Sequence, residues 1–169
     1  MTSLVNQPRG REAHMMAPNE TAKAMRKMAD GAVAFVAKVG VILDYTDDSI
    51  DRLEQYLSEL HDFLLTPEST WTESQKWSAA LTFGAYVGEV LRRGYGGEWQ
   101  AGTIGNPKLA IGAVEIRPAE KVLKRLKNSV EDHIGLYYRM VLTCIAAAPG
   151  EQEPAADLDC SGGRRESDG

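Results

Sequence analysis

The chain has 169 residues, of which 43% are hydrophobic and 25% are charged, and its formal net charge is -5. These values are close to those of an average globular protein, so they exclude a fibrous repeat and a chain that is disordered throughout. A chain of this length buries about two-thirds of the surface that it exposes when unfolded, which suits one domain and argues against two large ones.

The negative charge is concentrated at the C-terminal end. Residues 149–169 contain two bases and six acids, a balance of -4, and only one large aliphatic residue, Leu158. So little apolar surface does not offset the entropy of ordering, and we predict a disordered acidic tail over 149–169. Residues 1–18 show no hydrophobic periodicity and are predicted to be a disordered N-terminal segment. A single α+β domain is expected over residues 19–148.

The rest of the chain is nearly neutral, unlike the strongly basic surface of a nucleic-acid binder. No run approaches the roughly 18 to 20 apolar residues of a membrane span. Cys144 lies in an apolar helical pattern and Cys160 in the polar tail, so we expect no structural disulfide between them. The sequence therefore predicts a cytoplasmic protein that binds neither nucleic acid nor a membrane.

The first predicted elements are a helix and a strand. Asn19 suits a helix N-cap, and apolar residues follow it at helical spacing, with Gly31 weakening the helix without ending it. The segment 40–46, GVILDYT, is short and rich in β-branched and aromatic residues. It is bounded by Gly40 and by two aspartates, so we predict a strand.

Two helices follow. Asp47 or Asp48 is expected to cap the first, which Pro67 closes, and its apolar stripe consists of Ile50, Leu53, Tyr56, Leu57, Leu60, Phe63 and Leu64. The second is expected to begin at Thr72 or Ser74 and to end near Arg93. Apolar residues cover most of its circumference, which is typical of a central helix packed on two sides.

The last third of the chain combines strands with helices. Three glycines end the central helix, and strands are predicted over 98–101 and 109–116. Pro118 suits the first turn of a helix whose Lys121, Lys124 and Arg125 are expected to face solvent, and a last helix is expected from about Glu131 to before Pro149. The predicted fold is α+β: about five helices packed on a small, mainly antiparallel three-stranded sheet.

Gly84 and Gly88 lie four residues apart inside the central helix. Each costs about 1 kcal/mol relative to alanine, so something must offset that cost. The favoured interpretation is structural: both glycines lie on one face and let a neighbouring element approach the backbone. The functional alternative is that this flat face forms the floor of a pocket with Glu89 at its edge. Glu89 also stands four residues before Arg93, the favourable order for an exposed ion pair.

Four acids are candidates for a shared site: Asp44, Glu89, Glu98 and Glu115. Paired carboxylates perform acid–base chemistry when their environments separate their pKa values. Alternating acids on strands, however, usually face solvent, and this second interpretation is favoured. The position of Glu89 relative to the other three acids would decide between them.

Other chemistry has less support in the sequence. His14, His61 and His133 have no ligand-type spacing, so we predict no metal site and no cofactor. No serine or cysteine has a glycine elbow, and the glycines of RRGYGGEW follow a helix instead of preceding one, so they are not placed to hold phosphate. The basic residues 121–127 would suit an acidic partner, but a solvated face is the favoured interpretation.

Several short motifs suggest a family. LDY before a long amphipathic helix, then GAYVGEV, GGEW, IGAVEIRP and KVLKRLKNSVEDHIGLYY, together resemble an uncharacterised bacterial domain family with a Gly-Ala-Tyr-x-Gly-Glu helix and a Gly-Gly-x-Trp turn. The resemblance spans about residues 39–140. Because members have no established activity, it implies no catalytic residue. It implies only that eight residues occupy motif positions: Asp44, Tyr45, Gly84, Tyr86, Gly88, Glu89, Trp99 and Pro118.

Two functions remain open. The first is a non-enzymatic domain that binds another protein, in the manner of an adaptor or immunity protein, as the missing catalytic motif and the acidic tail suggest. The second is a small-molecule binder or hydrolase with a carboxylate-lined pocket between the glycine helix and the strands. The candidate binding residues are Asp44, Tyr45, Tyr86, Glu89, Glu98 and Trp99, and the candidate structural residues are Gly84, Gly88 and Pro118.

Overall fold

Helices form where the amphipathic pattern of the sequence is strongest. The computed structural model describes residues 18–103, 105–128 and 130–148, so the predictions for residues 1–17 and for the acidic tail lie outside the described residues. Within that part of the chain, the helices are α1 (Pro18–Ala37), α2 (Asp48–Leu64), α3 (Glu73–Tyr95), α4 (Pro118–Asn128) and α5 (Ile134–Ala147), with a 3₁₀ turn at Val130–Asp132. None of these helices is both long and apolar enough to cross a membrane.

The sheet has three short strands in the order β1-β2-β3, namely β1 (Glu98–Gln100), β2 (Lys108–Ile111) and β3 (Val114–Ile116). Both pairings are antiparallel, with Trp99 opposite Leu109 and Leu109 opposite Ile116. These three side chains are buried and face the helices, while Glu98, Ala110 and Glu115 lie in register on the other face. The α+β fold with five helices and a three-stranded antiparallel sheet is confirmed for the described residues.

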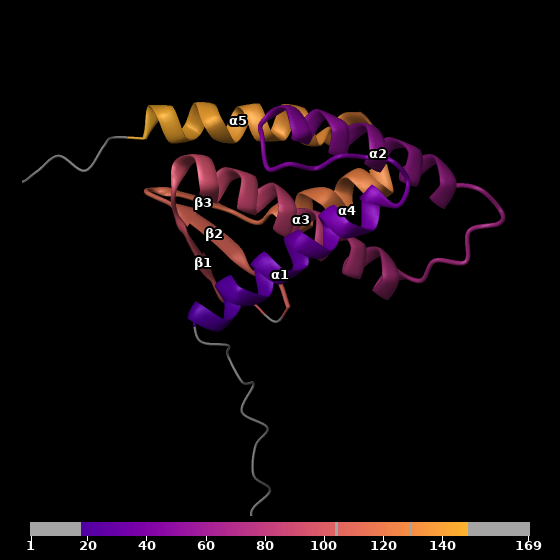
Figure 1. The fold of residues 1–169 in the computed structure, drawn as a ribbon, viewed down its shortest axis with the longest axis horizontal. Helices are drawn as coiled ribbons and strands as arrows, with labels where there is room; N and C mark the ends of the chain where they lie inside the picture. Colours follow the sequence, from indigo (N-terminus) through magenta and orange to yellow (C-terminus); the bar gives the residue numbers. More distant parts are fainter. Residues whose placement is uncertain (1–17, 104, 129, 149–169) are drawn as a thin grey trace, which may run out of the picture.

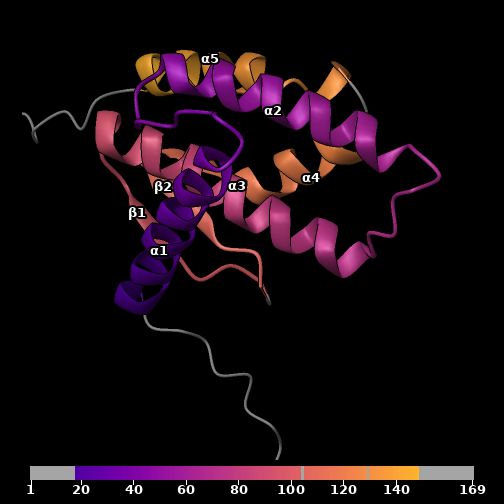
Figure 2. The same ribbon diagram turned by 45° about the vertical axis from the view of Figure 1, so that its right-hand side comes forward.

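The helices surround α3. In Figures 1 and 2, α1 crosses one side of α3, α4 runs along another, and α2 and α5 lie side by side above them. The α1 face toward this core consists of Met25, Ala29, Ala32 and Val36, all buried. From Phe83 to Leu91 every residue of α3 is buried, as expected of a helix packed on several sides. The prediction that this helix is central is confirmed.

Local capping predictions have mixed outcomes. The Thr72 side chain caps α3 by accepting from the Gln75 backbone amide, and the Gln75 side chain accepts from the Thr72 amide, which completes a capping box. Asp47 occupies the N-cap position of α2 but makes no side-chain cap. Its carboxylate instead accepts a 2.6 Å hydrogen bond from the Tyr138 hydroxyl of α5. A tertiary contact has replaced the local one.

The predicted strand at 40–46 is wrong. This segment is an irregular connection between α1 and α2, because side chains take the backbone groups that a strand partner would need. Arg52 donates to the Ile42 carbonyl at 2.7 Å, and the Tyr45 amide donates to the Tyr86 hydroxyl at 2.9 Å. The third strand arises elsewhere: the predicted strand 109–116 turns back on itself at Gly112, whose φ of +55° suits a two-residue hairpin.

The burial of Arg125 and the exposure of Phe63 are the opposite of what the sequence predicts. Arg125, predicted to face solvent, is 1% exposed and donates to the Glu54 carboxylate of α2 at 2.7 Å. The second oxygen of Glu54 accepts from the Ile134 amide, so this buried ion pair joins α2, α4 and the start of α5. Conversely, Phe63, predicted in the inward stripe of α2, is 45% exposed.

Gly84 and Gly88 of α3 make the approach of its neighbours possible. A Cβ atom at Gly84 would lie 2.6 Å from both the amide nitrogen and the Cα of Ala119, in the first turn of α4. A Cβ atom at Gly88 would collide with the Trp99 indole. The structural interpretation of both glycines is therefore correct, although at Gly88 the neighbour is a side chain and not main chain.

We predict that Gly84→Ala lowers the free energy of unfolding by about 1 to 3 kcal/mol, because the added methyl group meets backbone that has no flexible end to move aside. Urea unfolding measures the change. The control is Gly31→Ala in α1, where nothing lies within 4 Å of the new Cβ atom. That substitution should instead stabilise the protein by up to about 1 kcal/mol. Equal effects of the two substitutions would contradict the close packing of α3 on α4.

Candidate functional site

Glu89 is a fully buried carboxylate at the centre of a polar network. Its side chain is 0% exposed and accepts hydrogen bonds from the Trp99 indole N–H at 2.8 Å and from two Arg92 nitrogens at 2.8 and 3.0 Å. Arg93, the partner expected from the sequence, lies farther away at 3.7 Å. The ion pair is therefore not the exposed i,i+4 contact that the sequence suggests, but a buried cluster that ties α3 to β1.

The environment of Glu89 keeps it ionised. Burial acts to raise the pKa of this carboxyl, but the hydrogen bonds from Arg92 and Trp99 and the charges of Arg92 and Arg93 outweigh burial and lower the pKa below its ordinary value. A general acid at neutral pH needs the opposite shift. The cluster thus suits a structural or electrostatic role better than proton transfer.

Tyr45 is the one non-glycine residue with positive φ in the described part of the chain, at +62°. This conformation costs on the order of 1 kcal/mol or more and must be held by contacts. The Tyr45 hydroxyl donates to Asp30 at 2.7 Å, and the Arg93 guanidinium carbon lies 3.4 Å from the centre of its ring. Burial, and then the bond to Asp30, raises the pKa of Tyr45, so its hydroxyl remains a donor.

Tyr86 connects Tyr45 to the start of α2. Its ring centre lies 4.9 Å from that of Tyr45, and its hydroxyl accepts from the Tyr45 amide. The same hydroxyl lies 2.5 Å from the buried Ser49 hydroxyl in the first turn of α2. The network therefore joins α1, α2, α3, β1 and the 38–47 connection.

Four of the six candidate binding residues come together here: Tyr45, Tyr86, Glu89 and Trp99. The other two do not join them. Asp44 is exposed and pairs with Arg52 at 2.8 Å, and Glu98 is exposed on the outer face of the sheet. Pro118, a candidate structural residue, is buried in the first turn of α4 beside Gly84.

The four candidate acids do not share a cleft. Strand alternation places Glu98 and Glu115 on the outer face of the sheet, whereas Trp99 and its partner Glu89 lie on the inner side. Glu115 pairs with Lys108 at 2.6 Å. Asp44 lies apart from both, in the 38–47 connection, and each of Asp44, Glu89 and Glu115 already has a cationic partner.

The predicted basic cluster is also largely neutralised. Lys121 pairs with Asp132 at 2.6 Å, Lys127 pairs with Glu73, and Arg125 is buried against Glu54. Lys124 is exposed. In the described residues, no group of three or more His, Cys, Asp or Glu side chains is placed to hold a metal ion.

Hollows lie on either side of α1. One, of about 220 Å³, borders the network and is lined by Asn19, Ala22, Arg26, Arg92, Gly97, Glu98 and Trp99. The other, of about 330 Å³, is an apolar groove over the N-terminal half of α3, lined by Phe35, Leu60, Trp71, Gln75, Ser78, Ala79, Thr82 and Phe83. We call this second hollow the α1–α3 groove.

Sequence reasoning did not find this groove. Its residues come from α1, α2, α3 and the connection before α3, and no pair of them forms a motif. The one available signal was Phe35, which stands beside the core stripe of α1 and is 51% exposed. Arg92, Ser49 and Asp30 were missed in the network, because their roles depend on residues that meet them only in the folded chain.

No protein-family model matches the chain, no curated protein matches it, and no solved structure matches it. The resemblance to a family with a Gly-Ala-Tyr-x-Gly-Glu helix therefore stays a prediction.

We predict that Glu89→Gln lowers the free energy of unfolding at pH 7 by about 2 kcal/mol, because the hydrogen bonds from Arg92 and Trp99 lose their charged acceptor. Chemical denaturation followed by circular dichroism measures this loss. Glu115→Gln, which removes an exposed acid of the same type, is the control and should change stability little. If the two substitutions have the same effect, the buried network does not stabilise the fold.

The comparison of the wild type with Glu89→Gln also predicts how stability depends on pH. The folded state lowers the pKa of Glu89, so the stability that its charge provides is complete above its ordinary pKa and is lost as the pH falls through the folded-state pKa. The stability difference between the wild type and Glu89→Gln should stay constant from pH 7 to about pH 5 and shrink below it. A difference that grows on acidification would show that the sign of the pKa shift is wrong.

Proposed function

We propose that this domain is a non-enzymatic cytoplasmic protein that binds another protein, in the manner of an adaptor or immunity protein, through the α1–α3 groove. The observation that carries this proposal is the apolar groove itself. Exposed apolar hollows of this kind mark binding sites more often than isolated exposed side chains do.

Aromatic side chains pack against one another in the groove. Phe83, on its floor, packs against Phe35 with ring centres 6.5 Å apart and against Tyr56 with ring centres 5.5 Å apart. Phe83 is buried, whereas half of Phe35 remains in water. An aromatic side chain held at the edge of a preformed groove resembles the anchors that carry most of the affinity in protein interfaces. Phe63 of α2, three residues after Leu60 and so one helical turn away, is also exposed.

The state of the acids supports binding over catalysis. The buried candidate, Glu89, is held ionised by arginines, and the exposed candidates are dispersed. General acid–base catalysis needs an acid or a base inside a cleft. The α1–α3 groove has no acidic, basic or histidine side chain among its lining residues.

The second candidate function is binding of a small molecule in the hollow beside Trp99. What favours it is the pairing of opposite charges around that hollow, with Arg26 and Arg92 beside Glu98. A ligand carrying both a carboxylate and an amino group would match these charges. The volume of about 220 Å³ lies below the range of about 300 to 1,000 Å³ that is usual for ligand pockets, so we rank this candidate second.

We predict that Ser78→Trp prevents partner binding, because Ser78 is exposed on the floor of the groove and an indole there occupies the hollow without disturbing the core. The control is Thr143→Trp, at an exposed position of α5 outside the groove. The immobilised full-length variants are incubated with a lysate of the source cells, and the retained proteins are quantified.

A partner should be retained by the wild type and by Thr143→Trp, and Ser78→Trp should lose at least 90% of it, which corresponds to more than about 1.4 kcal/mol. Equal retention by all three proteins would rule out the groove as the binding site. If the wild type retains no specific protein, the proposal of a protein-binding function fails.

A further inference from the structure

We propose that the partner segment in the α1–α3 groove is an amphipathic helix with a cationic polar face, an inference that rests on the proposed function. The groove supplies the apolar contacts of such a helix, and an acidic surface formed by Glu59, Asp62 and Glu68 supplies the complementary charge. We call these three residues the acidic rim.

The acidic rim belongs to a stretch without bases. Between residues 53 and 75 there are five acids and neither lysine nor arginine. Two of the five are engaged: Glu54 is buried against Arg125, and Glu73 is paired with Lys76 and Lys127. Glu59, Asp62 and Glu68 are exposed and form no ion pair within the described part of the chain. Their charges are available to a partner.

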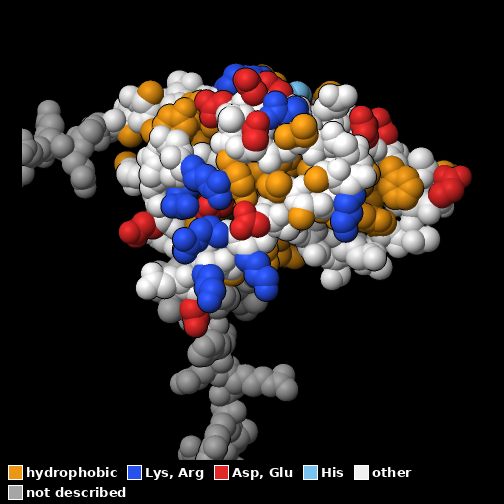
Figure 3. Space-filling view, in the orientation of Figure 1, with side chains coloured by type: hydrophobic (Ala, Val, Ile, Leu, Met, Phe, Trp, Pro, Cys, Tyr) orange, Lys and Arg blue, Asp and Glu red, His pale blue; other side chains and the backbone are white. Residues whose placement is uncertain are grey.

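Glu59 is the rim residue beside the apolar wall of the groove, whereas Asp62, two residues after Leu60, lies on another side of α2. Glu59 precedes Leu60, which lines the groove, and its charge adds to burial in raising the pKa of Tyr56, whose ring packs against Phe83. Figure 3 shows acidic side chains next to hydrophobic ones at its right-hand end, over the end of α2 and the connection to α3. A helix whose apolar face enters the groove would present part of its polar face to Glu59.

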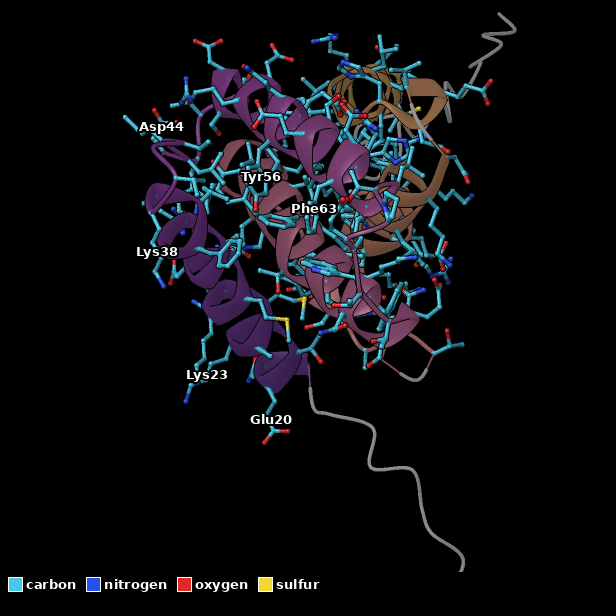
Figure 4. All side chains as sticks on the ribbon, turned by 90° about the vertical axis from the view of Figure 1, so that its right-hand side faces the viewer. Glu20, Lys23, Lys38, Asp44, Tyr56 and Phe63 are labelled. Carbon is cyan, nitrogen blue, oxygen red and sulfur yellow. The ribbon has the colours of Figure 1, made fainter. Side chains whose placement is uncertain are left out.

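Lys38 and Lys76 are bases near the groove, and neither forms an ion pair with a rim residue within the described part of the chain. Lys76 is held by Glu73, and Lys38, three residues after Phe35, lies on the outer side of α1, away from Phe63 (Figure 4). Unscreened acids on one wall attract basic partners and repel acidic ones. They also disfavour docking to an anionic lipid surface, which attracts basic and not acidic segments.

The geometry of the groove favours a helix over an extended peptide. Its lining residues come from three helices and the connection before α3, and none comes from a strand. An extended peptide gains affinity by pairing with an exposed strand edge, which this groove does not offer. A helix needs only apolar side chains at i, i+3, i+4 and i+7, and these suit a hollow lined by Phe35, Leu60 and Trp71.

The test uses two synthetic amphipathic peptides with the same apolar positions, one with lysine and arginine and the other with glutamate at the polar positions. Binding to the full-length protein is measured by fluorescence anisotropy at about 0.05 M and about 0.5 M salt, which covers the range over which exposed charges become screened. The cationic peptide should bind at least about tenfold more tightly than the anionic one at low salt, and high salt should reduce this difference.

Two sets of variants locate the effect. The triple variant Glu59→Gln, Asp62→Asn, Glu68→Gln should weaken binding of the cationic peptide about tenfold. The control is Glu20→Gln, Asp48→Asn, Glu131→Gln, which changes the net charge equally at exposed positions outside the groove. Ser78→Trp should prevent binding of the cationic peptide altogether.

The outcomes separate this inference from the proposed function. If both peptides bind equally and Ser78→Trp blocks both, the charge inference is overturned while the groove remains a binding site. If the rim variant weakens binding no more than the control, the rim is not the complementary surface. If neither peptide binds while a lysate protein is still retained through Ser78, the partner is not a cationic helix although the domain binds protein.

Discussion

The close approach of α3 to the first turn of α4 at Gly84 is the contact on which the arrangement of the domain depends. With no side chain at residue 84, the Ala119 backbone lies where a Cβ atom would otherwise stand. Gly88, one turn later, makes room in the same way for the Trp99 indole, so the sheet also rests on α3. The conformational cost of two glycines in one helix is offset because they allow α3 to be covered on several sides.

The burial of Glu89 follows from this packing. Once Trp99 lies across Gly88, its indole N–H reaches the carboxylate, and Arg92 supplies the charge that a buried carboxylate needs. Arg93 extends the same cluster to the strained Tyr45, whose ring contacts Tyr86. A connected framework of Tyr45, Tyr86, Glu89 and Trp99 thus joins α1, α2, α3 and β1. The Glu89 carboxylate already accepts hydrogen bonds from Arg92 and Trp99. The framework is therefore better suited to holding the 38–47 connection than to proton transfer.

The two halves of α3 therefore belong to different surfaces of the domain. The C-terminal half of α3 carries the polar network, whereas its N-terminal half, from Gln75 to Phe83, forms the floor of the apolar groove. The groove lies where α1 and α2 diverge over α3, and its acidic rim belongs to the end of α2 and the following connection. The network holds the 38–47 connection between α1 and α2, so it contributes to the fixed positions of the two helices that wall the groove. A preformed groove loses less conformational entropy on binding than a flexible one.

Short-range patterns in the chain were enough to predict most helices and the fold class. The α2 helix, the start of α3 at Thr72 and the start of α4 at Pro118 depend on neighbours within one or two turns, and these local preferences agree with the final fold. Two of the failed predictions involve distant partners. The 40–46 segment is not a strand because Tyr86 and Arg52 take its backbone groups, and Arg125 is buried because Glu54, 71 residues away, pairs with it. Hydrophobic periodicity predicts which apolar residues are buried. A polar side chain such as Arg125 can be buried only where the folded chain brings an opposite charge to it, and a groove exists only where the fold brings its walls together.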